Sequence, residues 1–243
     1  MDRVLVVGGT GRTGRRLLEE LVGRRVPARA IVRSASRLPA SVSKSPLVEV
    51  VEADLLSLSD DALRKQLAGC GAVASCLGHT LSLRGVFGPP RDLVTAAVRR
   101  ICDAIEASRP GVPVRYVLMS SVSVERPGGL DTRRGSLERT FVALLRQLVP
   151  PAADNQAAAD HLVHGIGSGN PFVEWSVVRP DALREGGVSE YRVDEGLVNS
   201  VFRPAETRMA NVAHFMAELA TDPAAWARWR GKMPVVTDRE GRP

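Results

Sequence analysis

Three glycines near the start of the chain have the spacing that points most clearly to chemistry. Gly8, Gly11 and Gly14 follow an apolar run, 4–7, and precede a leucine pattern typical of an amphipathic helix. Strand, tight turn and helix in this order are the setting in which a glycine motif binds the pyrophosphate of a dinucleotide. We expect Gly8 to turn the chain, Gly11 to let the pyrophosphate approach, and Gly14 to let the helix pack on the sheet. A glycine-rich turn in another kind of α/β protein is the alternative.

Basic side chains follow the second expected strand, 27–33. Arg33 ends this strand, Ser34 and Arg37 follow it, and Arg12 lies in the glycine turn. An acidic residue at this strand end would bind the ribose hydroxyls, whereas arginines suit a 2′-phosphate. The sequence therefore predicts NADP(H) in preference to NAD(H). Solvated surface arginines are the alternative, because arginine is frequent throughout the chain.

The next two expected strands also end in candidate site residues. Asp54 follows the strand at 47–52, where it could accept a hydrogen bond from an adenine amino group or cap a helix. The strand at 71–78 ends in glycine, and His79 follows it. His79 would point toward a nicotinamide site and could donate a proton there. A histidine in a surface loop is the alternative.

Two serines end the fifth expected strand, 114–119. Ser120 and Ser121 would lie beside the cofactor or the substrate, although turn formation also explains them. Ser121 and His79 are the candidate catalytic residues, and Ser120 is a candidate cofactor contact.

Alternation of strands and helices along the chain predicts the fold class. It is typical of an α/β, Rossmann-type, doubly wound and mostly parallel sheet. We expect a single domain over 1–243, with about 180–243 forming the substrate-side cap and the C-terminal helices. A helical apolar stripe at 133–148 is expected to pack in the core. Trp226 and Trp229 are expected to attach the C-terminus to the core.

Composition limits the classes of partner. Of 243 residues, 44% are hydrophobic and only 4% aromatic, and the formal net charge is +6. The basic residues are scattered and few aromatics are present to stack on bases, so we expect no nucleic-acid partner. No segment is apolar enough to span a bilayer and a strand begins near the N-terminus, so we expect a cytoplasmic protein without a signal peptide. The three cysteines lack metal-ligand spacing, so we expect no metal and buried thiols. The expected partner is a small-molecule substrate, and the protein is expected to be a monomer or a homodimer.

In order and spacing, these segments resemble the atypical short-chain dehydrogenase/reductases, and within them most closely the NAD(P)H-binding, NmrA-like group. The resemblance rests on 7–14, 30–33, 53–55, 117–121, 175–183 and 211–216. It implies a Rossmann-type core that holds NAD(P)H. The cofactor contacts that it implies are Gly8, Thr10, Gly11, Arg12, Thr13, Gly14, Arg33, Asp54, Leu55, Cys76, Leu77, Gly78 and Ser120.

One departure from the wider superfamily bears on activity. Its active members use a Tyr-x-x-x-Lys pair to move a proton to or from the substrate oxygen. Here the lysine position falls at about Gln156 and the tyrosine position at about Ala152, and the only tyrosines are Tyr116 and Tyr191. Three functions remain open. They are an NADPH-dependent oxidoreductase acting on a small organic substrate without this pair, an NADP(H)-sensing regulatory protein, and a redox-neutral biosynthetic enzyme that keeps the cofactor.

Overall fold

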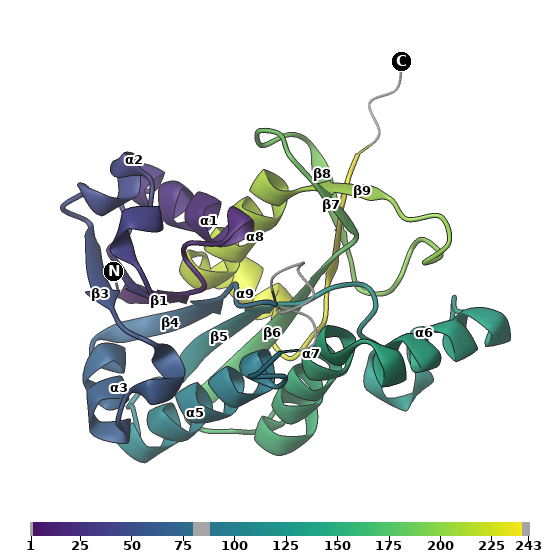
Figure 1. Ribbon diagram of the computed structural model, residues 1–243, viewed down its shortest axis with the longest axis horizontal. Helices are drawn as coiled ribbons and strands as arrows, with labels where there is room; N and C mark the ends of the chain where they lie inside the picture. The colour runs from purple at the N-terminus through teal and green to yellow at the C-terminus, as the bar shows by residue number, and fades with distance from the viewer. Residues whose placement is uncertain (1, 80–87, 240–243) are drawn as a thin grey trace.

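A single mixed sheet forms the centre of the protein (Figure 1). The computed structural model describes residues 2–79 and 88–239. Within them, eight strands pair in the order β3-β2-β1-β4-β5-β6-β10-β8, and all neighbouring pairs are parallel except β10 with β8. The strands are β1 (Arg3–Val7), β2 (Ala28–Val32), β3 (Val48–Glu52), β4 (Cys70–Ser75), β5 (Val114–Met119), β6 (Val173–Pro180), β8 (Tyr191–Asp194) and β10 (Val235–Asp238).

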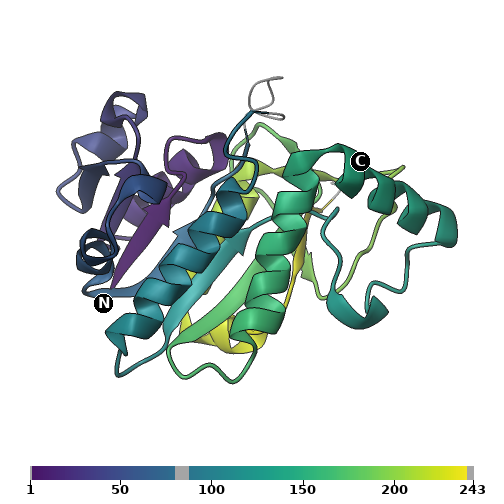
Figure 2. The ribbon, with the colours of Figure 1, turned by 60° about the horizontal axis from the view of Figure 1, so that its bottom comes forward.

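Helices cover both faces of this sheet. One face carries α1 (Arg12–Gly23), α2 (Ala40–Ser43), α8 (Met209–Thr221) and α9 (Pro223–Trp229). The other carries α3 (Asp60–Leu67), α5 (Leu93–Ser108), α7 (Pro150–Asp160) and a π-helix (His161–Ile166), and Figure 2 shows α5 and α7 side by side across it. Strand residues alternate between the two cores, with Leu5 and Val7 in one and Val4 and Val6 in the other.

The strand order confirms the expected Rossmann-like α/β fold. From β1 the chain runs outward to β2 and β3, then returns to β4 on the other side of β1. Ligands of such sheets bind at the carboxyl ends of the strands, where the direction of winding reverses. The ends of β1 and β4 lie at this point. The glycine turn follows β1 directly, so the fold places it there.

The C-terminal third contributes to both the sheet and its surroundings. β7 (Ala182–Arg184) follows β6 directly and pairs in parallel with β9 (Glu206–Arg208) in a small second sheet. In contrast, α8 packs into the core against α1, and ten of its thirteen residues are buried. Trp226 and Trp229 are buried on α9, which confirms that they hold this end of the chain to the core.

Helix α6 (Ser136–Leu148) shows that one packing prediction was wrong. The apolar stripe in this segment does not lie in the core, because Leu137, Leu144 and Leu148 are 77%, 50% and 63% exposed. Figure 1 shows α6 extending away from the sheet, where no second layer covers it. The helix is held instead by one flank of the stripe, on which Glu138 and Val142 are buried.

Two sequence expectations about chemistry can be compared with the described residues. Cys70 and Cys102 are buried, as predicted, and burial raises the pKa of both thiols. In the part of the chain that the structure describes, no three His, Cys, Asp or Glu side chains group in a way that could hold a metal ion. None of the described helices has the length and apolar character needed to cross a bilayer.

Candidate functional site

The glycine turn closes tightly against the end of β4. Gly8 has a φ of +75°, and a Cβ there would lie 2.5 Å from both the carbonyl carbon and the oxygen of Cys76. A Cβ on Gly14 would lie only 2.2 Å from the carbonyl oxygen of Gly8. At Gly11 the corresponding contact is 3.2 Å, and the amide of this residue donates to the Gly8 carbonyl. Glycine is therefore required at 8 and 14, and the turn presents bare backbone, as a pyrophosphate site needs.

The start of α1 has the character of an anion site. No side chain caps this helix end, and its first turn contains no acidic residue. The first N–H groups of a helix have no partner within the helix, and the helix dipole adds partial positive charge there. Thr13 is buried, Thr10 is half-buried and Arg12 is exposed. Together with the bare turn, this uncapped end fits the phosphates of a dinucleotide.

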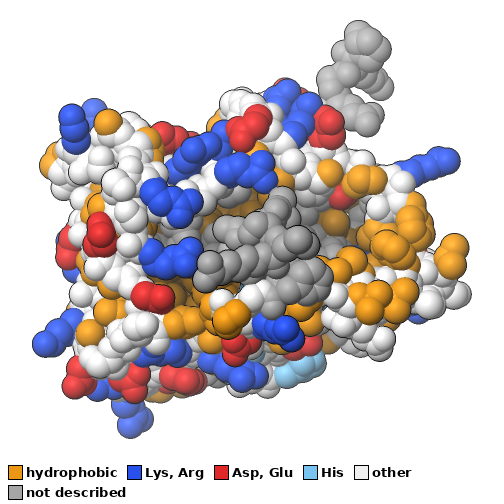
Figure 3. Space-filling view, in the orientation of Figure 1, with side chains coloured by type: hydrophobic (Ala, Val, Ile, Leu, Met, Phe, Trp, Pro, Cys, Tyr) orange, Lys and Arg blue, Asp and Glu red, His pale blue; other side chains and the backbone are white. Residues whose placement is uncertain are grey.

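Arginines lie next to the glycine turn without acidic partners. Arg12, Arg33 and Arg37 are exposed, and none of them forms an ion pair within the described residues. Figure 3 shows basic side chains gathered beside α1. One acidic group reaches the same loop, because Glu52 at the end of β3 accepts a hydrogen bond from the Ala35 amide (2.8 Å). The loop after β2 thus combines unpaired guanidinium groups with the carboxylate of Glu52. Glu52 was not singled out from the sequence.

The acidic residue predicted for the adenine is engaged locally. Asp54 is exposed, and its Oδ1 accepts a hydrogen bond from the Leu56 amide at 2.9 Å, which caps a short 3₁₀ turn. Asp54 does not cap α3, because Ser59 takes that role. Leu55 is buried, and its side chain packs in a core cluster. Because the Leu55 side chain is in the core, only its backbone atoms could contact the adenine of a cofactor.

The end of β4 meets the glycine turn through its backbone. The Cys76 amide donates to the Val7 carbonyl, while its thiol lies 3.9 Å from the Met216 sulfur on α8. Burial raises the pKa of the Cys76 thiol to about 12. Leu77 packs on the core, and Gly78 is exposed, with no atom within 4 Å of where its Cβ would lie. The strand end thus offers a ligand open space at Gly78 and no reactive thiolate.

The two serines after β5 differ in their bonding. Ser120 is 8% exposed, and its buried hydroxyl has no hydrogen-bond partner among residues 2–79 and 88–239. The Ser121 hydroxyl lies 2.6 Å from that of Ser123, within its own loop. A buried hydroxyl without a partner is costly and calls for an explanation, and a bound ligand would supply one. The unpaired Ser120 hydroxyl therefore fits the expected cofactor contact.

His79 lies in the loop after β4, as the alternative interpretation had it, but its side chain is buried rather than exposed at the surface. Its Nε2 lies 2.8 Å from Asp154 Oδ2, and the two side chains are 5% and 2% exposed. Asp154 lies on α7 and also accepts hydrogen bonds from the amides of Val94 and Thr95 at the start of α5. This carboxylate joins the loop after β4 to α5 and α7, and it fixes the His79 imidazole near the carboxyl edge of the sheet.

The position expected for a catalytic lysine has a structural role. Gln156 accepts from the Glu125 amide and donates to the Glu125 carbonyl and to Asp160, at 2.9, 3.2 and 2.8 Å. Tyr116 is fully buried within β5, where burial raises its pKa. Tyr191 lies on the edge strand β8 and hydrogen-bonds Glu218 on α8. The Tyr116 hydroxyl is thus buried and the Tyr191 hydroxyl is engaged by α8, so neither of these tyrosines is placed as a free proton donor.

One further carboxyl group lies at this edge, at the end of β6. Asp181 is half-buried, and burial raises its pKa above the ordinary value, although it accepts a hydrogen bond from the Ala205 amide at 3.0 Å. No local pattern distinguishes Asp181 or Asp154 from other acidic residues. They reach the site through strand order and helix packing, which local sequence patterns do not show.

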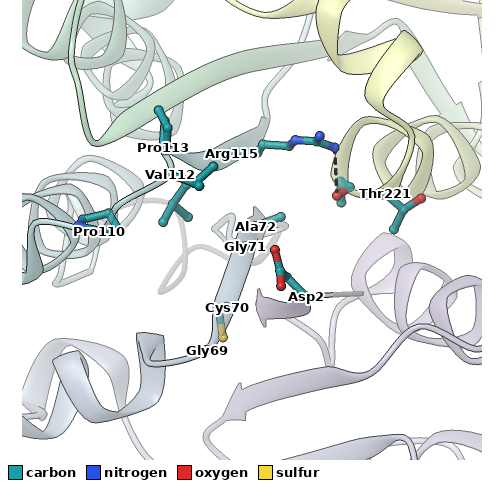
Figure 4. Close-up of a pocket in the computed structure, with 12 residues that line it drawn as sticks. Asp2, Gly69, Cys70, Gly71, Ala72, Pro110, Val112, Pro113, Arg115 and Thr221 are labelled. Atoms are coloured by element: carbon teal, nitrogen blue, oxygen red, sulfur yellow. Dashed lines mark hydrogen bonds between the residues drawn. The ribbon is translucent and has the colours of Figure 1, made fainter.

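A groove of about 480 Å³ lies at the opposite edge of the sheet (Figure 4). Asp2, Cys70 and Val112 line it, near the amino ends of β1, β4 and β5. The Arg115 guanidinium reaches across to the Ala220 carbonyl at the end of α8. This groove is separate from the glycine turn, because the two lie at opposite ends of the same strands.

Comparison with known proteins gives the family of this chain. The chain shares its fold with the oxidoreductase ylbE from Lactococcus lactis (18% identity, 98% of this chain and 91% of that chain, TM-score 0.68). It is also similar to ChuY, an anaerobillin reductase from Escherichia coli (18%, 99% and 99%, 0.68). A wide-type short-chain dehydrogenase/reductase from Veillonella parvula, solved in complex with NADP, is similar as well (11%, 98% and 94%, 0.67). No functionally curated protein matches the chain in sequence. The sequence profile of the NAD(P)H-binding family matches residues 8–223, in agreement with the resemblance seen in the sequence, and the chain belongs to that family.

Proposed function

We propose that the protein is an NADP(H)-dependent oxidoreductase that reduces a small organic substrate without a Tyr-x-x-x-Lys pair. The observation that carries the NADP(H) preference is a group of exposed arginines, Arg12, Arg33 and Arg37, which form no ion pair with any described residue and lie beside an uncapped helix and a bare glycine turn. Guanidinium groups bind phosphate by paired hydrogen bonds, and the 2′-phosphate distinguishes NADP from NAD. When bound, the reduced cofactor supplies a hydride ion.

Within this proposal, the chain's own residues orient the reactants. The Ser120 hydroxyl gains its missing partner from the bound cofactor, and Ser121 orients the substrate oxygen. His79 supplies a proton or directs one, and Asp154 holds its ring in place through the 2.8 Å contact. The strand order supports these roles. His79 follows β4 and the two serines follow β5, and these strands are neighbours in the sheet.

A fluorescence titration with NADPH and with NADH tests the cofactor preference. Arg33→Asp places a negative charge where we expect the 2′-phosphate, so NADPH should bind at least tenfold more weakly and NADH less than threefold more weakly. Arg99→Asp is the matched control, because Arg99 is exposed on α5, across the sheet from α1. Equal loss for the two nucleotides, or equal effects of the two variants, would refute the proposed 2′-phosphate site.

The bonding of Gln156 favours one second candidate, an NADP(H)-sensing regulatory protein. Both ends of its amide are occupied by Glu125 and Asp160, so the position that holds a lysine in active relatives of the wider superfamily serves the loop after β5. A sensor binds NADPH and consumes none. Measuring NADPH oxidation with carbonyl, quinone and flavin acceptors separates the candidates, since steady consumption with any of them supports the oxidoreductase.

A further inference from the structure

The exposed face of α6 is an apolar stripe without a partner in the described structure. Leu137, Phe141, Leu144 and Leu148, hereafter the α6 stripe, are 77%, 44%, 50% and 63% exposed. The Phe202 ring extends the stripe, with its centroid 5.2 Å from that of Phe141. Figure 3 shows hydrophobic side chains gathered over the region of α6. Contiguous apolar surface of this kind marks an interaction site more often than a chance exposure.

The spacing of the α6 stripe is that of a helix-pairing seam. Successive members are four, three and four residues apart, which is the a/d pattern of helices that pack along one line. The pattern is also symmetric about its centre. If a second α6 lies antiparallel, Leu137 faces Leu148 of the second copy and Phe141 faces Leu144 of the second copy. A two-fold interface requires this kind of reciprocal contact, with one patch complementary to itself.

Charges on α6 lie away from the stripe. Its exposed neighbours on one flank are Thr140, Ala143 and Gln147, which are uncharged. Glu138 is buried on the other flank and accepts a hydrogen bond from the Val201 amide, and Arg146 pairs with Glu125 at 3.0 Å. Arg139 falls on the opposite side of the helix, since each residue turns it by about 100°. Two copies can therefore approach along the stripe without bringing like charges together.

We propose that the α6 stripe is the contact surface of a homodimer, in which two α6 helices pack antiparallel across a two-fold axis. The same charge distribution disfavours a membrane surface, because helices that lie in a bilayer interface usually carry Lys and Arg along their polar face. It also disfavours a charged peptide, which would find no complementary charge beside the stripe. The internal symmetry of the spacing fits a second copy of this chain.

Sedimentation velocity over a concentration series tests whether the α6 stripe holds a homodimer together. The wild-type protein should form a dimer of two 26.1 kDa chains at micromolar concentration. The double variant Phe141→Glu and Leu144→Glu should raise the dimer dissociation constant at least 100-fold, because it places four carboxylates in the seam. Val112→Glu is the matched control, since Val112 is 77% exposed at the other edge of the sheet. An unchanged far-UV circular dichroism spectrum of the double variant excludes misfolding, because loss of the dimer by itself lowers Tm. A wild-type monomer at 100 µM, or a dimer that the double variant leaves intact, would overturn the proposal.

Cross-linking tests the antiparallel arrangement separately. The Leu137→Cys and Leu148→Cys variants should join through a short bifunctional thiol reagent only when the two are mixed. In an antiparallel pair, the same position in the two copies is offset along the helix axis by eleven residues, or about 16 Å at 1.5 Å per residue. Two copies of one variant therefore keep their thiols too far apart for a short reagent. The wild-type protein is the control, because Cys70 and Cys102 are buried and the Cys76 thiol packs against Met216. Cross-linking of either variant alone, or stripe-dependent binding of the monomer to anionic vesicles, would contradict this geometry.

Discussion

Replacing Gly14 by alanine is the sharpest test of how the glycine turn works. The new Cβ would lie 2.2 Å from the Gly8 carbonyl oxygen, so α1 must retreat by about 1 Å to restore ordinary contact. Overpacking of this kind costs about 1–3 kcal/mol, and the gain from replacing glycine within a helix returns about 0.5–1 kcal/mol. We expect a net loss of about 1–2 kcal/mol, which lowers Tm by about 2–8 °C in a chain of this size.

The same movement should weaken cofactor binding. A shift of about 1 Å carries the N–H groups of the α1 start out of hydrogen-bond range of a phosphate. Hydrogen bonds to charged groups contribute about 1.5–3 kcal/mol each, so losing one weakens binding about 10- to 100-fold. Fluorescence titration with NADPH measures this loss, and differential scanning calorimetry measures the change in Tm.

The matched control lies at the other end of the same helix. A Cβ on Gly23 would meet no atom within 4 Å, so Gly23→Ala should leave NADPH binding unchanged and should not lower Tm. If Gly14→Ala binds NADPH like the wild type, the helix start does not hold the pyrophosphate. If the two variants have the same Tm, the close packing at Gly14 is not a constraint on the fold.

Two further predictions concern buried polar groups. Ser120→Ala removes a buried hydroxyl that has no partner, so we expect the Tm of the free protein to stay the same or rise while NADPH binding weakens; a lower Tm without ligand would show that the hydroxyl is already satisfied. Asp131→Asn leaves the fully buried Arg179 without its ionic partner, 2.8 Å away, and should cost about 3–5 kcal/mol, measured by urea unfolding at neutral pH. Burial alone would raise the pKa of Asp131, but hydrogen bonds and charge from Arg179 and Arg126 outweigh it and lower that pKa below its ordinary value. The ionised Asp131 carboxylate therefore contributes its full stabilisation above the ordinary carboxyl pKa, and this stabilisation is lost as the pH falls through the lowered pKa. The difference in free energy of unfolding between the wild type and Asp131→Asn should therefore become smaller in acid.

Local sequence patterns determined the α/β alternation and the position of the glycine turn. Apolar runs ending in glycine fix a strand and a turn, because backbone geometry and side-chain periodicity act over a few residues. Gly8 and Gly14 could be singled out for this reason, and the structure shows clashes for any larger residue at both positions. The doubly wound, mostly parallel sheet followed from the alternation of strands and helices and from the preference for right-handed crossovers, whereas the order of its strands came from the structure.

Tertiary packing alone decided which side chains meet at the site and which faces are covered. His79 and Asp154 are 75 residues apart in sequence, and they pair because the fold brings the loop after β4 against α7. The periodicity of the α6 stripe predicts an amphipathic helix correctly but not what covers it, since that depends on the layers the rest of the chain supplies. Periodicity is a property of one segment, whereas burial and pairing depend on contacts between segments far apart in the chain.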